Sequence, residues 1–274
     1  MKNRLTHGLL AQVLLLLTLA PALVAEASQD GLDLANKIHY RPRPNDQVSF
    51  SVMTLSGSGM GRTRELFQYR LDGTRRGDTA TLIRFVSPRD IAGTGLLTND
   101  FAGSDDSDQW VYLPAAGRER RISSDRKGGR FLGSDFYFED LRDRDPRKDT
   151  HRILGQAELD GKKMWQLEST PLDPENSVYS KRIGWIDPVT YTPMRLDYYE
   201  RGQATPVKRW LVGKIELLGK FWVVTDRTMT DLQAGTSTRL QDVRTLADQS
   251  VDANLFTRKA LIDRAQLLEK KWQP

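Results

Sequence analysis

Residues 208–246 of the chain read KRWLVGKIELLGKFWVVTDRTMTDLQAGTSTRLQDVRTL. They divide into three segments rich in β-branched and aromatic residues, at 208–217, 221–229 and 236–246, which is the composition of β-strands. Only Leu218-Gly219-Lys220 separates the first two segments. A connection this short leaves no room for a helical crossover, so the strands it joins must run antiparallel. The stretch therefore predicts a sheet built from hairpins.

The same pattern continues towards the N-terminus. Two further hairpins are predicted, 151–159 with 162–168 across Asp160-Gly161, and 179–186 with 194–199 across Asp187-Pro188. Earlier strands are predicted at 48–52, 65–71, 79–86, 96–97 and 110–113. At least ten strands with little helix indicate a mainly β chain of the α+β class. We expect one curved antiparallel sheet or open barrel, whose concave apolar face must be covered by helices or by a ligand.

Three segments depart from the strand pattern. Residues 33–38 predict a short amphipathic helix, which the prolines of Arg41-Pro42-Arg43-Pro44 end. Residues 256–270 predict a second helix with Leu261, Ala265 and Leu268 on one face. Residues 114–147 are rich in arginine and aromatic residues and alternate poorly, so a long ordered loop or a broken helix is expected there.

The first 27 residues have the features of a secretory signal peptide. Lys2 and Arg4 precede an apolar run over 9–19, and Ala25-Glu26-Ala27 fits the small-x-small cleavage rule. We expect cleavage before Ser28, a single domain over 28–274, and a location in the periplasm of a Gram-negative bacterium.

Composition excludes many kinds of site. The 274 residues carry a net charge of +5 and include no cysteine, which excludes disulfides, thiolate metal sites and cysteine nucleophiles. The histidines are His7, His39 and His151, and no pair of them has ligand spacing. No metal, cofactor or nucleic acid is therefore expected, although the basic residues between 118 and 130 are compatible with anionic lipid head groups or an acidic partner protein.

Catalytic patterns are equally sparse. No Gly-x-Ser-x-Gly elbow occurs, and the adjacent carboxylates Glu139 and Asp140 point to opposite faces if they lie on a strand. A lipid hydrolase using Ser134 or His151 is the weakest of three functional hypotheses, and we expect no catalytic residues.

Three sequence blocks carry a resemblance to a known family. They are FVSPRDIAGTGLL at 85–97, DDSDQWVYLPA at 105–115 and GSDFYFEDL at 133–141. In this order and spacing they resemble the outer membrane lipoprotein-sorting proteins, relatives of the LolA/LolB lipoprotein carriers. Arg130 departs from the family, which usually has a small residue before the position of Phe131.

The resemblance implies a LolA/LolB-like unclosed antiparallel β-barrel, with helices or a loop lidding a hydrophobic cavity. It also implies a non-enzymatic carrier of lipid or lipoprotein acyl chains, with an RND-type inner-membrane exporter as a plausible partner. We expect the carrier to be a monomer. The alternative is an accessory subunit that docks on such an exporter and carries no free cargo.

The carrier hypothesis names two sets of candidate residues. The cavity candidates are Phe85, Leu97, Trp110, Tyr112, Phe131, Phe136 and Phe138. Arg118, Arg120 and Arg121 are candidates for contact with a head group or a partner, because the guanidinium fork suits phosphate and carboxylate. The segment around Phe131 to Phe138 is expected to move on the glycines that flank it.

Overall fold

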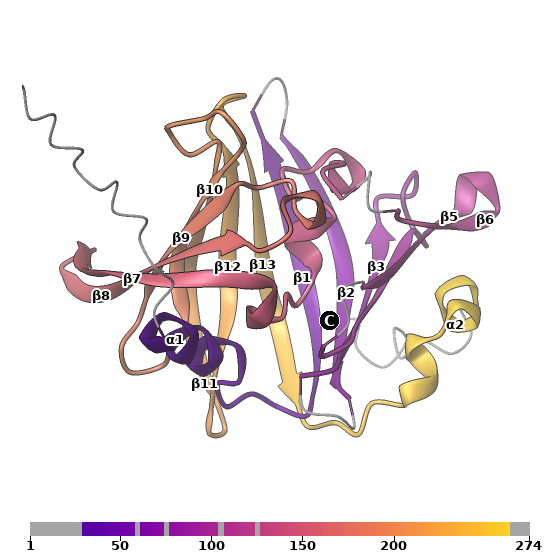
Figure 1. The fold of residues 1–274 in the computed structure, drawn as a ribbon. Coiled ribbons are helices and arrows are strands. Elements are labelled where there is room, and N and C mark those ends of the chain that lie inside the picture. Colours follow the sequence, from indigo (N-terminus) through magenta and orange to yellow (C-terminus); the bar gives the residue numbers. More distant parts are fainter. Residues whose placement is uncertain (1–28, 58–60, 74–76, 104–106, 124–126, 264–274) are drawn as a thin grey trace, which may run out of the picture.

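The fold was obtained as a computed structural model that describes residues 29–57, 61–73, 77–103, 107–123 and 127–263 (Figure 1). The predicted signal peptide lies outside these residues. The helices are α1 (Gln29–His39) and α2 (Arg258–Ile262). The strands are β1 (Asp46–Ser56), β2 (Arg62–Asp72), β3 (Thr79–Ser87), β4 (Gly95–Asp100), β5 (Asp108–Leu113), β6 (Arg118–Arg121), β7 (Asp149–Leu159), β8 (Lys162–Pro171), β9 (Lys181–Ile186), β10 (Pro193–Tyr199), β11 (Lys208–Leu218), β12 (Phe221–Asp231) and β13 (Thr236–Ala247).

These strands form one antiparallel sheet of two meanders. The spatial order is β6-β5-β4-β3-β2-β1-β13-β12-β11-β10-β9-β8-β7. The first strand, β1, lies in the middle of the sheet, and β2 to β6 follow one another out to one edge. The next strand, β7, lies at the opposite edge, and β8 to β13 follow one another back to the middle. The two meanders meet where β1 pairs with β13, from Gln47 opposite Ala247 to Ser56 opposite Ser237.

The predicted unclosed antiparallel barrel is confirmed, and each predicted hairpin is present. Two local predictions need correction. Residues 118–121 form the edge strand β6, which the sequence pattern missed because Arg-Glu-Arg-Arg has no apolar alternation. The second helix ends at Ile262, where Asp263 turns to an extended conformation, and the rest of the predicted range beyond 263 lies outside the described residues.

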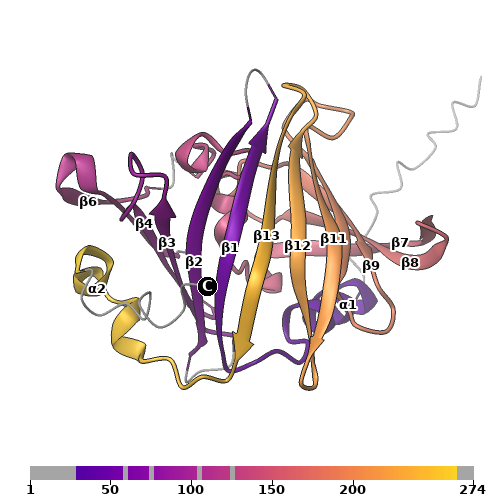
Figure 2. The same cartoon turned by 180° about the vertical axis from the view of Figure 1, so that it is seen from behind.

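The sheet curls strongly along its length. In Figure 1, β7 and β8 cross in front of β12 and β13, and α1 lies below them on the same side. Figure 2 shows β2, β1, β13, β12 and β11 from the convex side, with α1 behind them. No helix among the described residues is both long and apolar enough to cross a bilayer.

Apolar residues pack on both faces of the first meander. Because successive strand residues point to opposite faces, Leu66 and Phe67 enter different clusters. The convex-face cluster joins Phe67 and Leu82 to residues from 251–261, which include α2. There the buried Arg84 donates to the carbonyls of Ala260 and Leu261 at 2.9 and 2.8 Å, which holds α2 against β3.

The concave face is filled by the chain itself. Residues 127–148, here called the crossing segment, connect the β6 edge to the β7 edge across the concave face of the curled sheet (Figure 1). Phe131, Phe136 and Phe138 of this segment pack in the concave-face cluster beside Phe85 and Leu96. Much of the concavity is therefore occupied by protein.

Buried polar contacts hold the crossing segment on the sheet. The Asp135 carboxylate accepts from the hydroxyls of Thr236 and Thr238 on β13, at 2.6 and 2.7 Å, and from Arg130 at 2.7 Å. Lys208 of β11 donates to the Asp135 carbonyl at 2.5 Å. A buried carboxylate needs such partners because unpaired burial is costly, so these contacts make the position of the segment specific.

Asp135→Ala is expected to lower the free energy of unfolding by roughly 3 kcal/mol, because it removes the carboxylate acceptor of the buried Thr238 hydroxyl and one of the two carboxylates that pair with Arg130. Chemical denaturation measures the change. Asp108→Ala is the control, because Asp108 pairs with the exposed Arg121 at the sheet edge, and such a pair contributes about 0–1 kcal/mol. Equal losses in the two variants would show that the Asp135 contacts do not anchor the segment.

Candidate functional site

Helix α1 lies against the curled edge of the sheet. Its buried residues Leu34 and Ala35 pack with Leu167 of β8 and Ile186 of β9. Gly31 allows the close approach, because a Cβ atom there would lie 2.4 Å from the carbonyl oxygen of His151 on β7. The helix therefore covers β7–β9 without being part of the sheet.

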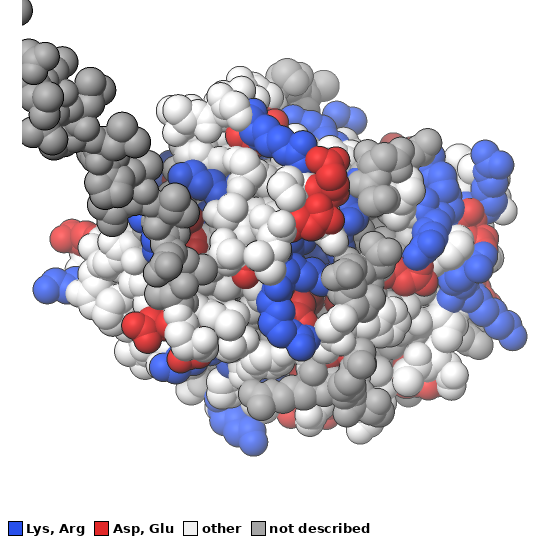
Figure 3. All heavy atoms as spheres, viewed as in Figure 1, with Lys and Arg blue, Asp and Glu red and all other residues white. Residues whose placement is uncertain are grey.

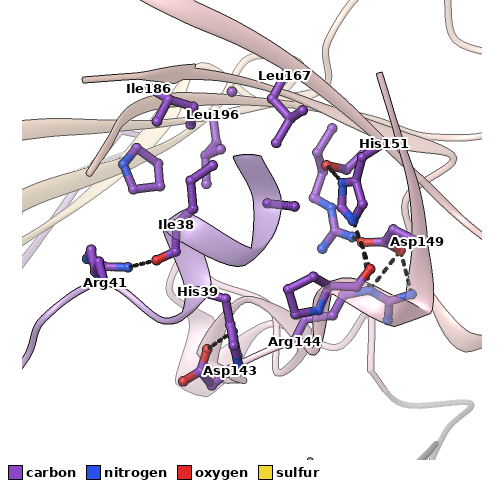
Figure 4. Close-up of a pocket in the computed structure, with 16 residues that line it drawn as sticks. Ile38, His39, Arg41, Asp143, Arg144, Asp149, His151, Leu167, Ile186 and Leu196 are labelled. Carbon is purple, nitrogen blue, oxygen red and sulfur yellow. Dashed lines mark hydrogen bonds and ion pairs between the residues drawn. The ribbon is translucent and has the colours of Figure 1, made fainter. Parts of the chain in front are cut away.

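A pocket of about 210 Å³ lies between α1, strands β7–β10 and the end of the crossing segment. Figure 4 shows Leu167, Ile186 and Leu196 on one side of it, facing Ile38 of the helix. The opposite side is polar and is formed by His39, Asp143, Arg144, Asp149 and His151. An apolar wall facing a charged one suits an amphiphilic ligand.

The charged wall is held together around Asp149. Arg144 donates to both oxygens of this carboxylate, with Nη2 2.8 Å from Oδ1, and Arg182 of β9 also pairs with it. Arg144 further donates to the carbonyls of Asn176 and Lys148, each at 3.3 Å. Arg144 and Arg182 therefore have structural roles, because their side chains already pair with Asp149.

His39 and Asp143 form the part of the wall nearest the end of α1. The Nδ1 atom of His39 lies 3.2 Å from Asp143, and Arg43 donates to the same carboxylate at 2.9 Å. Burial opposes the charge of Asp143, but the hydrogen bond from His39 and the positive charge of Arg43 outweigh it and hold the pKa of Asp143 well below its usual range.

His151 makes the one serine–histidine contact of the pocket. Its Nδ1 lies 2.9 Å from the Ser169 hydroxyl and its Nε2 2.7 Å from the Pro146 carbonyl. His151 and Ser169 are directly opposed across β7 and β8, so the strand register alone explains why their side chains meet. Ser134, the serine considered in the hydrolase hypothesis, is fully buried in the crossing segment and does not line this pocket.

The cavity candidates from the sequence do not share one space. Phe85, Phe131, Phe136 and Phe138 lie together in the concave-face cluster, where each is at most 8% exposed. Leu97, Trp110 and Tyr112 belong instead to the convex-face cluster with residues 251–261. None of the seven lines the pocket beneath α1. The structure thus places these residues in two packed cores on opposite faces of the sheet.

The three candidate arginines lie on the edge strand β6. Arg118, Arg120 and Arg121 are exposed, and Arg121 pairs with Asp108 at 3.0 Å. In Figure 3, basic side chains interleaved with acidic ones gather at the end of the molecule where β5, β6 and α2 lie. Charged residues on an edge strand prevent it from pairing with other chains, so these arginines have a structural explanation, and they are remote from the pocket lining.

Sequence reasoning missed the pocket residues because they come from five separate stretches of the chain. Two features of the sequence point to this region, the helix at 33–38 and the Arg41-Pro42-Arg43 turn that follows it. An amphipathic helix next to a sheet is expected to cover apolar surface. Nothing local linked them to Leu167, Ile186 and Leu196, which the fold brings to the helix.

Comparisons with known proteins agree with this architecture. A family model described as an uncharacterized protein matches residues 77–263. An outer membrane lipoprotein-sorting protein domain from Vibrio parahaemolyticus is 29% identical, with a TM-score of 0.80 over 85% of this chain and 99% of that one. A DUF1329 family protein from Desulfovibrio piger is also 29% identical, with a TM-score of 0.81 over 86% and 99% of the two chains.

A more distant structure supports the fold alone. A LolA superfamily protein from Nitrosomonas europaea is 16% identical and has a TM-score of 0.65, over 86% of this chain and all of that one. No protein with a curated description matches the sequence.

The His151 contacts predict a pH dependence of stability. Burial lowers the pKa of His151, with Asp149 and the Pro146 carbonyl acting in the opposite direction. The folded state then binds fewer protons than the unfolded state just below the ordinary histidine pKa, so stability is lost as the pH falls through that range. Between pH 7.5 and pH 5, the wild-type protein should lose more unfolding free energy than His151→Gln. An equal loss would contradict the assignment.

Proposed function

Because the chain belongs to the family whose model matches residues 77–263 and shares its fold with an outer membrane lipoprotein-sorting protein domain and a LolA superfamily protein, we propose that it is a non-enzymatic periplasmic carrier. It binds the acyl chain of a lipid or lipoprotein and moves it towards the outer membrane, without any covalent step. The observation that carries the proposal is the apolar pocket beneath α1, which lies on the concave side of an unclosed sheet.

The energetics suit a carrier. Each methylene group that leaves water for an apolar pocket contributes about 0.8 kcal/mol. The pocket of about 210 Å³ is smaller than the roughly 300–1,000 Å³ of most ligand sites. A long acyl chain is therefore accommodated only when one of the elements over the concave face moves.

We infer that α1 is the element that moves. Its attachment includes the burial of Leu34 and Ala35, and a leucine contributes about 1.5–3 kcal/mol when fully buried. The crossing segment, in contrast, buries three phenylalanines and is tied down at Asp135, Glu139 and Asp140. This assignment replaces the expectation that the glycine-flanked segment around Phe131 is the lid.

The remaining parts of the proposal concern location and partners. Residues 1–27 act as the cleaved export signal, residues 28–274 form one domain, and the carrier works as a monomer. The exposed arginines of β6, which lie away from the pocket, contact lipid head groups at a membrane surface or the acidic surface of an RND-type exporter. An exporter-bound subunit that carries no free cargo is the alternative outcome of the first test below.

The mature chain, produced in the periplasm and purified without detergent, is expected to carry lipid. Native mass spectrometry should show a bound species of lipid mass that is lost on denaturation, and organic extraction should recover it. A clean apoprotein mass would contradict the carrier proposal and favour docking on an exporter, which crosslinking then tests.

Leu196→Trp is expected to weaken binding of a fluorescent fatty-acid probe by at least about tenfold, because excluding two or three methylenes from the pocket removes about 1.6–2.4 kcal/mol. Fluorescence titration measures the affinity, and thermal melting confirms folding.

Phe136→Ala is the matched control. Phe136 is 4% exposed in the concave-face core, so its loss should cost about 3–5 kcal/mol of stability with little change in probe affinity, and Trp110→Ala should behave similarly. If the two control variants lose affinity and Leu196→Trp does not, the acyl site lies among the sequence candidates and not under α1.

A further inference from the structure

We propose that Arg41, at the end of α1, binds the anionic group of an amphiphile whose single chain occupies the pocket beneath the helix. The ligand class is a carboxylate or phosphate monoester carrying one alkyl chain. This inference rests on the proposed function and names the ligand chemistry of the same site.

Arg41 differs from the other arginines of the pocket in having few partners. Among the described residues, its guanidinium makes one hydrogen bond, from Nη1 to the Ile38 carbonyl at 2.8 Å, and no ion pair. Figure 4 shows this contact on the apolar side of the pocket, away from Asp149 and His151. A guanidinium has five N–H donors, so most of its capacity is available to a ligand.

Arginines cluster around Arg41. Arg41, Arg43 and Arg70 lie near one another, and the carboxylates among them are Asp72 and Asp143. Asp78 lines a surface cleft with Arg41 and accepts from the Ala102 backbone N–H at 2.7 Å. Asp72 pairs with Arg70 and Arg43, and Asp143 pairs with Arg43 and His39. Asp72 and Asp143 are thus engaged by other cations, and Arg41, among the described residues, makes no ion pair with either.

Binding of an anion would stabilise the charged form of the Arg41 guanidinium. Burial, together with the positive charge of Arg43, lowers the pKa of Arg41 to about 10. An incoming carboxylate or phosphate would relieve both effects and accept a bidentate pair of hydrogen bonds.

The position of Arg41 fits the junction of tail and head group. It lines the pocket beneath α1 and also a cleft of about 370 Å³ at the surface, formed with Tyr40, Arg43, Asn45, Asp72 and Asp78 among others. An alkyl chain between Ile38 and Leu196 would therefore place its charged end at Arg41, with solvent reached through the cleft.

The test compares decanoate, decyl phosphate and decanol as ligands of the delipidated mature protein, by isothermal titration calorimetry. We expect at least one of the two anions to bind at least tenfold more tightly than decanol. Arg41→Gln should remove this preference and leave decanol affinity unchanged, whereas Arg41→Lys, which keeps the charge but loses the fork, should retain part of it. The stronger anion identifies the head group as carboxylate or phosphate.

Arg201→Gln is the control, because Arg201 is an exposed arginine that does not line the pocket. It should leave all three affinities unchanged. Equal binding of decanol and both anions to the wild-type protein, or an anion preference that survives in Arg41→Gln, would overturn the inference and leave the acyl-carrier proposal standing. If none of the three ligands binds, the carrier proposal itself fails.

Discussion

The pairing of β1 with β13 is the interaction on which the rest of the structure depends. All other neighbouring strands in the sheet are consecutive in sequence, so local turns are enough to align them. Ser51 and Asp242, which hydrogen-bond across the β1–β13 pair at 2.7 Å, are 191 residues apart. Gln68 and Arg227 donate to the same Asp242 carboxylate. A slip of one residue would move this polar group to the other face of the sheet, so the network makes the register specific.

This pairing determines the course of the crossing segment. When the two meanders join at their last and first strands, β6 and β7 become the opposite edges of the sheet. The chain between them must pass over the concave face, and it does so by burying Phe131, Phe136 and Phe138 there. The crossing segment therefore fills the concave face with an apolar core, while the β6 and β7 edges that it connects stay unpaired among the described strands and the barrel stays open.

The pocket beneath α1 has both apolar and charged walls because of the same connection. The crossing segment ends at β7, so its last residues, Asp143 to Pro146, form one wall of the pocket while β7–β10 and α1 form the others. The strands contribute Leu167, Ile186 and Leu196, and the segment contributes Asp143 and Arg144, which pair with Arg43 and with Asp149 of β7. A pocket built this way binds a chain with a charged end more naturally than a purely apolar molecule.

The sequence by itself determined the hairpins, the antiparallel sheet and its openness, because turns such as Asp160-Gly161 and alternation such as that of Val48, Phe50 and Val52 act over a few residues. The order and spacing of the blocks at 85–97, 105–115 and 133–141 pointed to the same fold by resemblance. Only the tertiary structure decided which strand face meets which partner. Leu96 and Leu97 are neighbours of the same type, yet they face different cores, because residues 251–261 cover one side and the crossing segment covers the other. The pocket likewise required Ile38 and Leu196 to meet, and contacts over such separations follow from the curl of the whole sheet, which no local pattern encodes.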